Sequence, residues 1–330
     1  MDPESTPITA KSASPAYRAA PHWAAVLAAI LTWPLVFAGG LVTTYRVGMA
    51  VPDWPTTFGE NIFTYDLAEA AFGVRVEHIH RLAGAAVGLC TIALMLDFLA
   101  FDRRRSVKAL GVLALIAVIA QGVLGGMRVR NNSTTLAMIH GCTGQAFFAF
   151  MVGLAAITAR SWFAPRRPVE GEGRVKVLAA ATLLIAYFQI TLGAWLRHYP
   201  APAPLMSHAG SALLVVGVVA ATIVAVRRRN ADVPGLLGPL RAIEMTLGLQ
   251  LVLGIAAWWM LRPFDGIARG VSTAQALIRT GHQANAALLL GAAVVLVIRV
   301  YGRAAGVPEA RPTAEPATTQ WPAGLGVAAS

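Results

Sequence analysis

Residues 109–126 read ALGVLALIAVIAQGVLGG, a stretch of eighteen residues with no charge and a single polar side chain, Gln121. A helix rises about 1.5 Å per residue, and about 20 apolar residues cross the roughly 30 Å hydrocarbon core of a bilayer. Inside lipid every backbone N–H and C=O must be paired within the segment, which favours a helix. This stretch therefore predicts a membrane-spanning helix over residues 108–127.

Similar apolar stretches recur along the rest of the chain. The eight predicted spans are 23–44, 79–101, 108–127, 136–159, 176–196, 206–226, 238–261 and 276–300. The composition agrees, with 56% hydrophobic and 13% charged residues. That charged share is about half of the roughly 25% typical of soluble domains. The predicted fold class is all-α, a polytopic membrane protein with eight transmembrane helices.

The net charge of +11 is unevenly distributed along the chain. Of the 27 Lys and Arg residues, 18 fall in the two tails and in alternate connections, around Arg103–Arg105, Arg160–Lys176 and Arg227–Arg229. The other connections hold few basic residues and most of the acidic residues found between helices, five of them in connection 45–77. Because basic loops stay in the cytoplasm, both termini are predicted to be cytoplasmic and loop 45–77 external, in the cell (inner) membrane. The alternation does not favour a nucleic-acid-binding face.

A short motif, Gln-x-x-Leu-Gly, recurs at the same place in three of the odd-numbered spans. It occupies Gln121–Gly125, Gln189–Gly193 and Gln250–Gly254, and the first span has only a remnant, Phe37–Gly40. Small residues alone would indicate ordinary helix packing in a membrane. Glutamine is costly in lipid, however, so its recurrence at one place indicates an internal repeat.

The repeat divides the helices into two pseudo-symmetric four-helix bundles. The N-terminal half covers residues 23–160 and the C-terminal half 176–302, with a cytoplasmic linker at 161–175. Residues 1–22 lack the apolar core of a signal peptide and are predicted to form a disordered cytoplasmic lead-in. Residues 303–330 are rich in Ala, Pro and Thr, and are predicted to form a disordered cytoplasmic tail.

Each even-numbered span begins with a histidine, at His80, His140, His208 and His282. His140 and His208 follow the glutamine of the preceding motif by 19 residues, and His282 follows its glutamine by 32. Because all the even spans run from outside to inside, the four imidazoles are predicted to lie at one depth near the outer face. Ionisable residues inside a membrane are candidates for function.

Histidines spread over four helices suit a heme better than a bare metal ion. Zinc and copper sites commonly use cysteine or carboxylate partners, or three histidines in one tight cluster. Two histidines on facing helices instead match the two axial positions of a heme iron. Four histidines thus predict two hemes, or one heme and one heme-like substrate.

Three polar residues surround the first of these histidines. Glu77 precedes His80 by three residues, so both project from one face of a helical turn. Glu77 either moves protons beside the iron or is a helix N-terminal acid stabilised by the macrodipole. His78 is expected to be an interfacial polar residue, and Arg81 to pair with a heme propionate or to face lipid headgroups.

The string Glu77-His-Ile-His80-Arg81-Leu-Ala-Gly84 resembles the glutamate–histidine motif of heme A synthases. The resemblance extends over about residues 25–300. It includes the Gln-x-x-Leu-Gly motifs, the histidine helices Leu136–His140, Leu205–His208 and Arg279–Gln283, and the loop segment Gly48–Gly59.

The resemblance implies an enzyme that oxidises a methyl group of heme O to a formyl group by successive hydroxylations, giving heme A for terminal oxidase assembly. It implies that His80 and His140 hold the substrate, that His208 and His282 ligate a permanent heme b, and that Glu77 is catalytic. It also implies an electron donor and contact with the enzyme that makes heme O, and allows a homo-oligomer. Some members carry a cysteine pair in an outer loop, which this chain lacks.

Two other functions also fit four membrane histidines. A membrane b-type cytochrome carries electrons between hemes, but crossing a membrane needs hemes at two depths, whereas these histidines are predicted at one. A heme transporter or chaperone would bind and release heme without chemistry. The hemes found in the isolated protein would distinguish the three.

Overall fold

The computed structural model describes residues 17–164, 168–260 and 270–302 and has an all-α fold. Its helices are α1 (Ala19–Thr44), α2 (Phe72–Phe101), α3 (Arg105–Arg130), α4 (Thr134–Thr158), α5 (Glu172–His198), α6 (Pro202–Arg229), α7 (Leu237–Met260) and α8 (Thr273–Tyr301), with a 3-10 turn at Arg160–Trp162. All eight α-helices are long and apolar enough to cross a membrane. The predicted fold class is therefore confirmed. Residues 1–16 of the predicted lead-in and the whole predicted tail, 303–330, lie outside the described residues.

Several helices begin earlier than the hydropathy of the sequence predicts. Helix α1 starts at Ala19, inside the predicted lead-in, and α5 starts at Glu172, inside the predicted linker. The largest difference is at α2, which starts at Phe72 rather than at residue 79. Its first turn contacts the preceding loop, with Phe72 against the Tyr45 ring at 4.9 Å and Gly73 beside Val47 and Ala50. Apolar content marks only the part of a helix that faces lipid, so it misses turns that are covered by a loop.

The four histidines consequently lie deeper in their helices than the first few residues. His80 lies eight residues after the start of α2 and His282 nine after the start of α8, while His140 and His208 each lie six residues in. At about 1.5 Å per residue, this is roughly two turns below the helix starts. All four still lie toward the same end of the bundle, which we call the histidine end.

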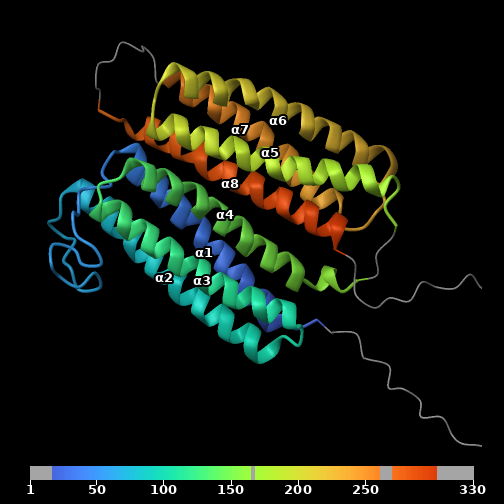
Figure 1. Ribbon diagram of the computed structural model, residues 1–330, viewed down its shortest axis with the longest axis horizontal. Coiled ribbons are helices and arrows are strands. Elements are labelled where there is room, and N and C mark those ends of the chain that lie inside the picture. The colour runs from blue at the N-terminus through green and yellow to red at the C-terminus, as the bar shows by residue number, and fades with distance from the viewer. Residues whose placement is uncertain (1–16, 165–167, 261–269, 303–330) are drawn as a thin grey trace, which may run out of the picture.

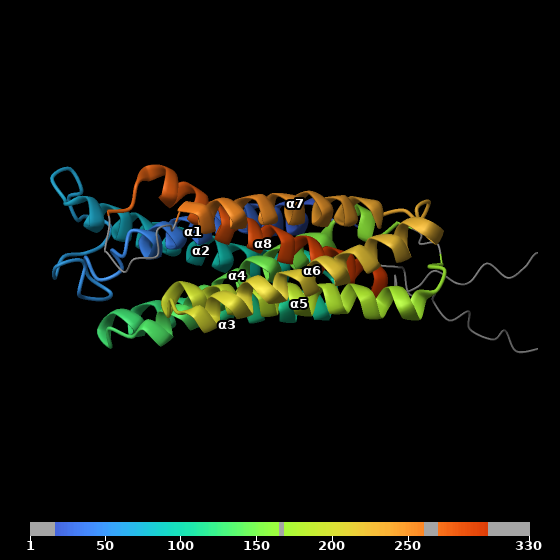
Figure 2. The same ribbon diagram turned by 90° about the horizontal axis from the view of Figure 1, so that it is seen from above.

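The helices form two groups of four in which each helix touches its neighbours. Helices α1 to α4 close into one ring and α5 to α8 into a second, and the rings meet through α1 with α8, α4 with α5, and α4 with α8. Helices α4 and α8 run through the middle of the molecule (Figures 1 and 2) and are the most buried of the eight. Gly153 and Gly291 allow this close crossing, since a Cβ on each would lie 3.3 Å from a valine of the other helix.

Polar bonds also join the two rings near the histidine end. The indole Nε1 of Trp33 donates to the Ala284 carbonyl at 3.0 Å, and the hydroxyls of Thr44 and Thr280 lie 3.1 Å apart. In an apolar surrounding such bonds fix one register between α1 and α8, because breaking them would leave buried polar groups without partners.

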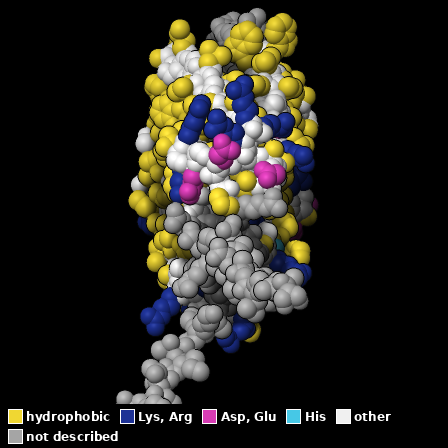
Figure 3. Space-filling view, turned by 90° about the vertical axis from the view of Figure 1, so that its right-hand side faces the viewer, with side chains coloured by type: hydrophobic (Ala, Val, Ile, Leu, Met, Phe, Trp, Pro, Cys, Tyr) yellow, Lys and Arg dark blue, Asp and Glu magenta, His cyan; other side chains and the backbone are white. Residues whose placement is uncertain are grey.

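The opposite end of the bundle carries most of the basic side chains. Figure 3 shows this end, with Lys and Arg gathered in the upper part of the face and again toward its lower edge, and hydrophobic side chains at the top and along the sides. The basic residues there include Arg103–Arg105, Lys108, Arg174, Lys176, Arg227–Arg229 and Arg299. We call it the basic end. The first described residues of α1 and the last of α8 lie at this end, and loop 45–71 lies at the other (Figure 1).

Candidate functional site

Each of the four histidine rings packs against a glycine of the preceding odd-numbered helix. The pairs, with the distance from an ideal Cβ on the glycine to ring Cε1, are Gly39 and His80 (3.0 Å), Gly125 and His140 (3.2 Å), Gly193 and His208 (2.9 Å), and Gly254 and His282 (3.0 Å). Any larger side chain would press on the ring, so a glycine here lets the imidazole lie against the odd helix. This explains the glycine that ends each Gln-x-x-Leu-Gly motif.

Helix α1 makes the same glycine–histidine contact but has no glutamine in the motif. Each ring also comes near the backbone of the residue four positions before its glycine: Leu35, Gln121, Gln189 and Gln250. Leu35 and Gly39 thus occupy the positions of the motif in α1. The remnant predicted from the sequence at Phe37–Gly40 is the fourth copy, and its glycine rather than its polar residue has been kept.

The four rings form two pairs with nearly the same geometry. Among helices α1 to α4, the imidazole centroids of His80 and His140 are 6.4 Å apart and their planes cross at 81°. Among helices α5 to α8, the centroids of His208 and His282 are 6.1 Å apart and their planes cross at 86°. The repeat found in the sequence therefore brings the predicted residues together in the predicted pairs.

This spacing fits two imidazoles that share one metal ion. With metal–nitrogen bonds of about 2.0–2.1 Å on both sides, and each centroid about 1.1 Å behind its nitrogen, the centroids would lie about 6.3 Å apart. In three of the rings, those of His80, His140 and His282, Nδ1 is buried and makes no hydrogen bond within the described residues. Buried polar atoms normally have a partner, so the rings suit a ligand.

The ligand that fits is a heme rather than a bare ion. The described part of the chain contains no group of three or more His, Cys, Asp or Glu residues that could hold a metal ion. A heme brings four porphyrin nitrogens and asks the protein only for the two axial ligands. Each histidine pair offers those two.

The motif glutamines anchor the histidine helices of the C-terminal half. Gln189 Nε2 donates to the backbone carbonyl of His208 at 2.7 Å and lies 3.2 Å from its Nδ1. Gln250 Nε2 lies 3.3 Å from His282 Nε2, and its Oε1 accepts from Asn285 at 2.7 Å. These bonds satisfy a side chain that would be costly in lipid and orient the ring beside it.

Glu77 is wholly enclosed, at 1% exposure, and bound by two arginines. Its Oε1 accepts from Arg81 at 3.1 Å and from Arg128 of α3 at 3.5 Å, and its Oε2 accepts from the backbone N–H of Val51 at 3.0 Å. The interpretation as a helix N-terminal acid is wrong, because α2 begins at Phe72 and has no acid in its first turn. Two guanidinium groups therefore contact Glu77 at the histidine end of the first half.

Arg81 ties loop 45–71 to this carboxylate. Its guanidinium donates to the carbonyls of Asp53 at 2.7 Å, Thr56 at 2.9 Å and Val51 at 2.9 Å, as well as to Glu77. The sequence predicted a propionate or a lipid headgroup as its partner. The structure shows its partners within the protein, three loop carbonyls and Glu77, and the contact with a propionate or headgroup stays a prediction.

The loop is itself closed by Asp53. Burial would raise the pKa of this carboxyl, but the hydrogen bonds from the Thr56 hydroxyl and the backbone N–H groups of Gly59 and Phe58 outweigh it and lower the pKa to about 2. Asp53 therefore stays ionised at physiological pH. The neighbouring Trp54 packs on α3 at Gly126, where a Cβ would collide with the indole ring.

His78 is the site residue that the sequence misplaced most. It was expected at the interface with lipid, yet it is 0% exposed, and its Nδ1 lies 2.9 Å from the Thr57 hydroxyl. Loop 45–71 covers it. No periodic signal marks that loop, so nothing in the sequence pattern indicated the burial.

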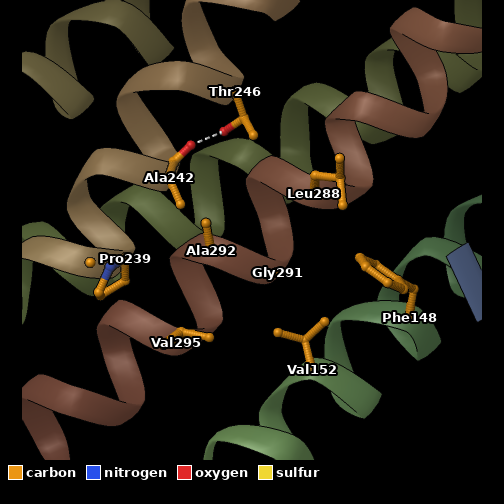
Figure 4. Close-up of a pocket in the computed structure, with 10 residues that line it drawn as sticks. Phe148, Val152, Pro239, Ala242, Thr246, Leu288, Gly291, Ala292 and Val295 are labelled. Carbon is orange, nitrogen blue, oxygen red and sulfur yellow. Dashed lines mark hydrogen bonds between the residues drawn. The ribbon is translucent and has the colours of Figure 1, made fainter. Parts of the chain in front are cut away.

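One groove lies away from the histidines, between α4, α7 and α8. It has a volume of about 390 Å³ and is lined by apolar side chains, among them Phe148, Val152 and Leu288 (Figure 4). Its one hydroxyl, on Thr246, donates to the Ala242 carbonyl at 2.6 Å. None of the four histidines lines it, so it offers apolar space without chemistry.

The fold and the site together define an all-α multi-pass membrane protein with two matched histidine pairs. Residues 22–205, more than half of the chain, match the family described as cytochrome oxidase assembly protein. The chain belongs to this family. It is also similar to the heme A synthases of Listeria monocytogenes serotype 4a (strain HCC23) and Listeria innocua serovar 6a, each 29% identical over 136 residues.

These matches have a limited reach. The aligned residues cover 40% of this chain and 42% of each Listeria protein, so the chain spans about two fifths of the length of the relatives it matches. The family match includes Glu77, His80 and His140 but ends before His208. The comparisons confirm the family expected from the sequence and leave the roles of individual residues to be argued.

Proposed function

We propose that this protein is a heme A synthase, which oxidises a methyl group of heme O to the formyl group of heme A. In this proposal His80 and His140 hold heme O as substrate, and His208 and His282 are the axial ligands of a resident heme b. A bound heme b would supply one-electron chemistry to the reaction. Electrons would come from a donor outside the chain, and heme O from the enzyme that makes it.

The chain's own residues would place the substrate and handle protons. The glycines at positions 39 and 125 let the two imidazoles lie close against α1 and α3, at the spacing that suits one iron between them. Glu77, one turn from His80, would be a proton acceptor or donor, held in place by Arg128 and the Val51 N–H. Loop 45–71 would restrict the access of water to this half.

One observation favours an enzyme over an electron carrier. The two histidine pairs have matching geometry, yet among the described residues only the first has a buried carboxylate one turn away, with two arginines around it. A cytochrome has no need of such a difference, and hemes that lie at one end cannot carry electrons across a membrane. An enzyme in which one half binds the substrate and the other half binds a permanent cofactor does require the two halves to differ.

The porphyrin content of membranes tests the proposal. In a host that makes heme O but lacks its own heme A synthase, expression of this chain should produce heme A, detected by extraction and chromatography. Membranes without the chain should contain heme O and heme b only. Heme b bound to the purified chain, with no heme A in the membranes at normal protein level, would favour the cytochrome. Heme O bound without any oxidised product would favour the transporter.

We also propose that the basic end faces the cytoplasm and the histidine end faces outward. Lys and Arg gather at the basic end (Figure 3), and cytoplasmic loops carry an excess of these residues. A reporter fused after Arg303 should be active only in the cytoplasm, and one inserted at Glu69, in the exposed part of loop 45–71, only outside. The reverse pattern would place both histidine pairs at the inner face.

A further inference from the structure

The two histidine pairs differ in the charges around them. In the N-terminal half Arg81 and Arg128 share the carboxylate of Glu77. In the C-terminal half two arginines, Arg197 and Arg279, form no ion pair with any carboxylate in the part of the chain that the structure describes. We propose that Arg197 and Arg279 bind the two propionate carboxylates of the porphyrin held by His208 and His282. This inference rests on the proposed function, which assigns a resident heme to that pair.

Arg197 is the better defined of the two. It follows Gly193 by one helical turn on α5, so it lies just above the point where His208 packs on that helix. One guanidinium nitrogen donates to the Gly40 carbonyl at 2.6 Å and to the Thr44 hydroxyl. Its Nε is buried and makes no hydrogen bond to any residue that the structure describes. The guanidinium thus keeps an unused buried donor, and its charge is not neutralised by the two neutral acceptors.

Arg279 lies on α8, the helix that carries the second histidine of the pair. It precedes His282 by three residues on α8, so the two side chains share one face of the helix. Arg279 makes no hydrogen bond or ion pair within the described residues, and it is close enough to Arg197 for the two charges to interact. Arg197 in turn acts electrostatically on His282. Two guanidinium groups therefore flank one histidine pair.

Such a pair of cations needs an anion. Burying like charges together without a counter-charge is costly, because each loses its water and repels the other. The planar fork of arginine matches a carboxylate with two parallel hydrogen bonds. A heme carries two carboxylates on one edge of its ring, so one porphyrin between His208 and His282 would supply one to each arginine.

The difference in charge also predicts that the C-terminal half retains its porphyrin while the N-terminal half exchanges its porphyrin. Around His80 and His140 the arginines already have Glu77, so a porphyrin there gains less from them. Around His208 and His282 its propionates would meet two arginines that lack a carboxylate. The same chain would thus hold a tightly bound heme in one half and a releasable one in the other.

The test compares native heme b with its propionate dimethyl ester, which has the same ring and iron but no carboxylates. Full-length protein carrying His140→Ala, so that only the C-terminal pair reports, is loaded with either heme. The rate of heme transfer to a scavenging apoprotein is then measured by absorption. With both arginines intact, the protein should lose native heme at least roughly tenfold more slowly than the ester. Arg197→Gln and Arg279→Gln should each speed the loss of native heme roughly tenfold and shrink the difference between the two hemes.

Arg104→Gln is the matched control. Arg104 also donates to a backbone carbonyl of another helix, that of Ile157, but at the basic end. It should change neither rate. Equal rates for native heme and ester from the unmodified site would overturn the inference without any substitution, and would leave another anion, such as a lipid phosphate, for these arginines. If Arg197→Gln speeds the loss of both hemes equally, its role is only to join α5 to α1. The readout is heme retention, so absence of heme A in the membrane test would leave this result unaffected.

Discussion

Replacing His80 or His140 with alanine is expected to abolish heme A formation while heme b stays bound to the protein. Each histidine pair lies within its own group of four helices, and each imidazole packs against its own glycine. Removing one axial ligand of the first pair should therefore release or misplace heme O and leave the second pair intact. Heme A in membranes should fall below detection, and the low-spin heme b spectrum of the purified protein should remain.

The reciprocal substitutions supply the control. His208→Ala or His282→Ala should lower bound heme b or convert it to a high-spin form, because axial ligands set both retention and spin state. His22→Ala, at the basic end of α1, should do neither at equal protein level. If His80→Ala removed heme b and His208→Ala did not, the substrate and cofactor halves would be exchanged.

The four histidines could be predicted because the repeat contains residues that lipid tolerates poorly, whereas their assignment to two pairs came from the family resemblance. A glutamine and a glycine at fixed spacing before a histidine are informative in a chain that is otherwise apolar. The first copy was harder to recognise, since it has Leu35 in place of glutamine and keeps only Gly39. The first copy therefore keeps the glycine that the packed imidazole requires, but lacks the glutamine that forms a hydrogen bond in the C-terminal copies.

The surroundings of Glu77 could not be predicted in the same way. Its partners come from a loop and from another helix, at Val51 and Arg128, and neither obeys a helical period with it. Loop 45–71 folds by local turns around Asp53 and by the bonds of Arg81, not by a hydrophobic pattern. Hydropathy also placed the start of α2 too late, which made Glu77 look like a terminal residue.

Glu77→Gln is expected to leave both hemes bound while heme A production falls roughly a hundredfold or more, the usual range for loss of a general acid or base. The amide keeps the size of the side chain and can still accept from the Val51 N–H, but it cannot exchange a proton at that position. Heme O, or its half-oxidised hydroxymethyl form, should accumulate in the extracted porphyrins. Glu69→Gln, which removes an exposed carboxylate of the same loop, should have no effect.

The ion pairs of Glu77 raise a second explanation that the same experiment can separate. The amide leaves Arg81 and Arg128 buried without a counter-charge, so loop 45–71 could loosen and lower activity by lost structure alone. Loosening should expose Trp54, which packs on Gly126, and should appear as faster proteolysis within the loop. Glu77→Asp keeps the charge and should hold the loop closed while restoring part of the heme A. If Glu77→Gln makes heme A at a near-normal rate with the loop closed, Glu77 only anchors the loop and takes no part in proton transfer.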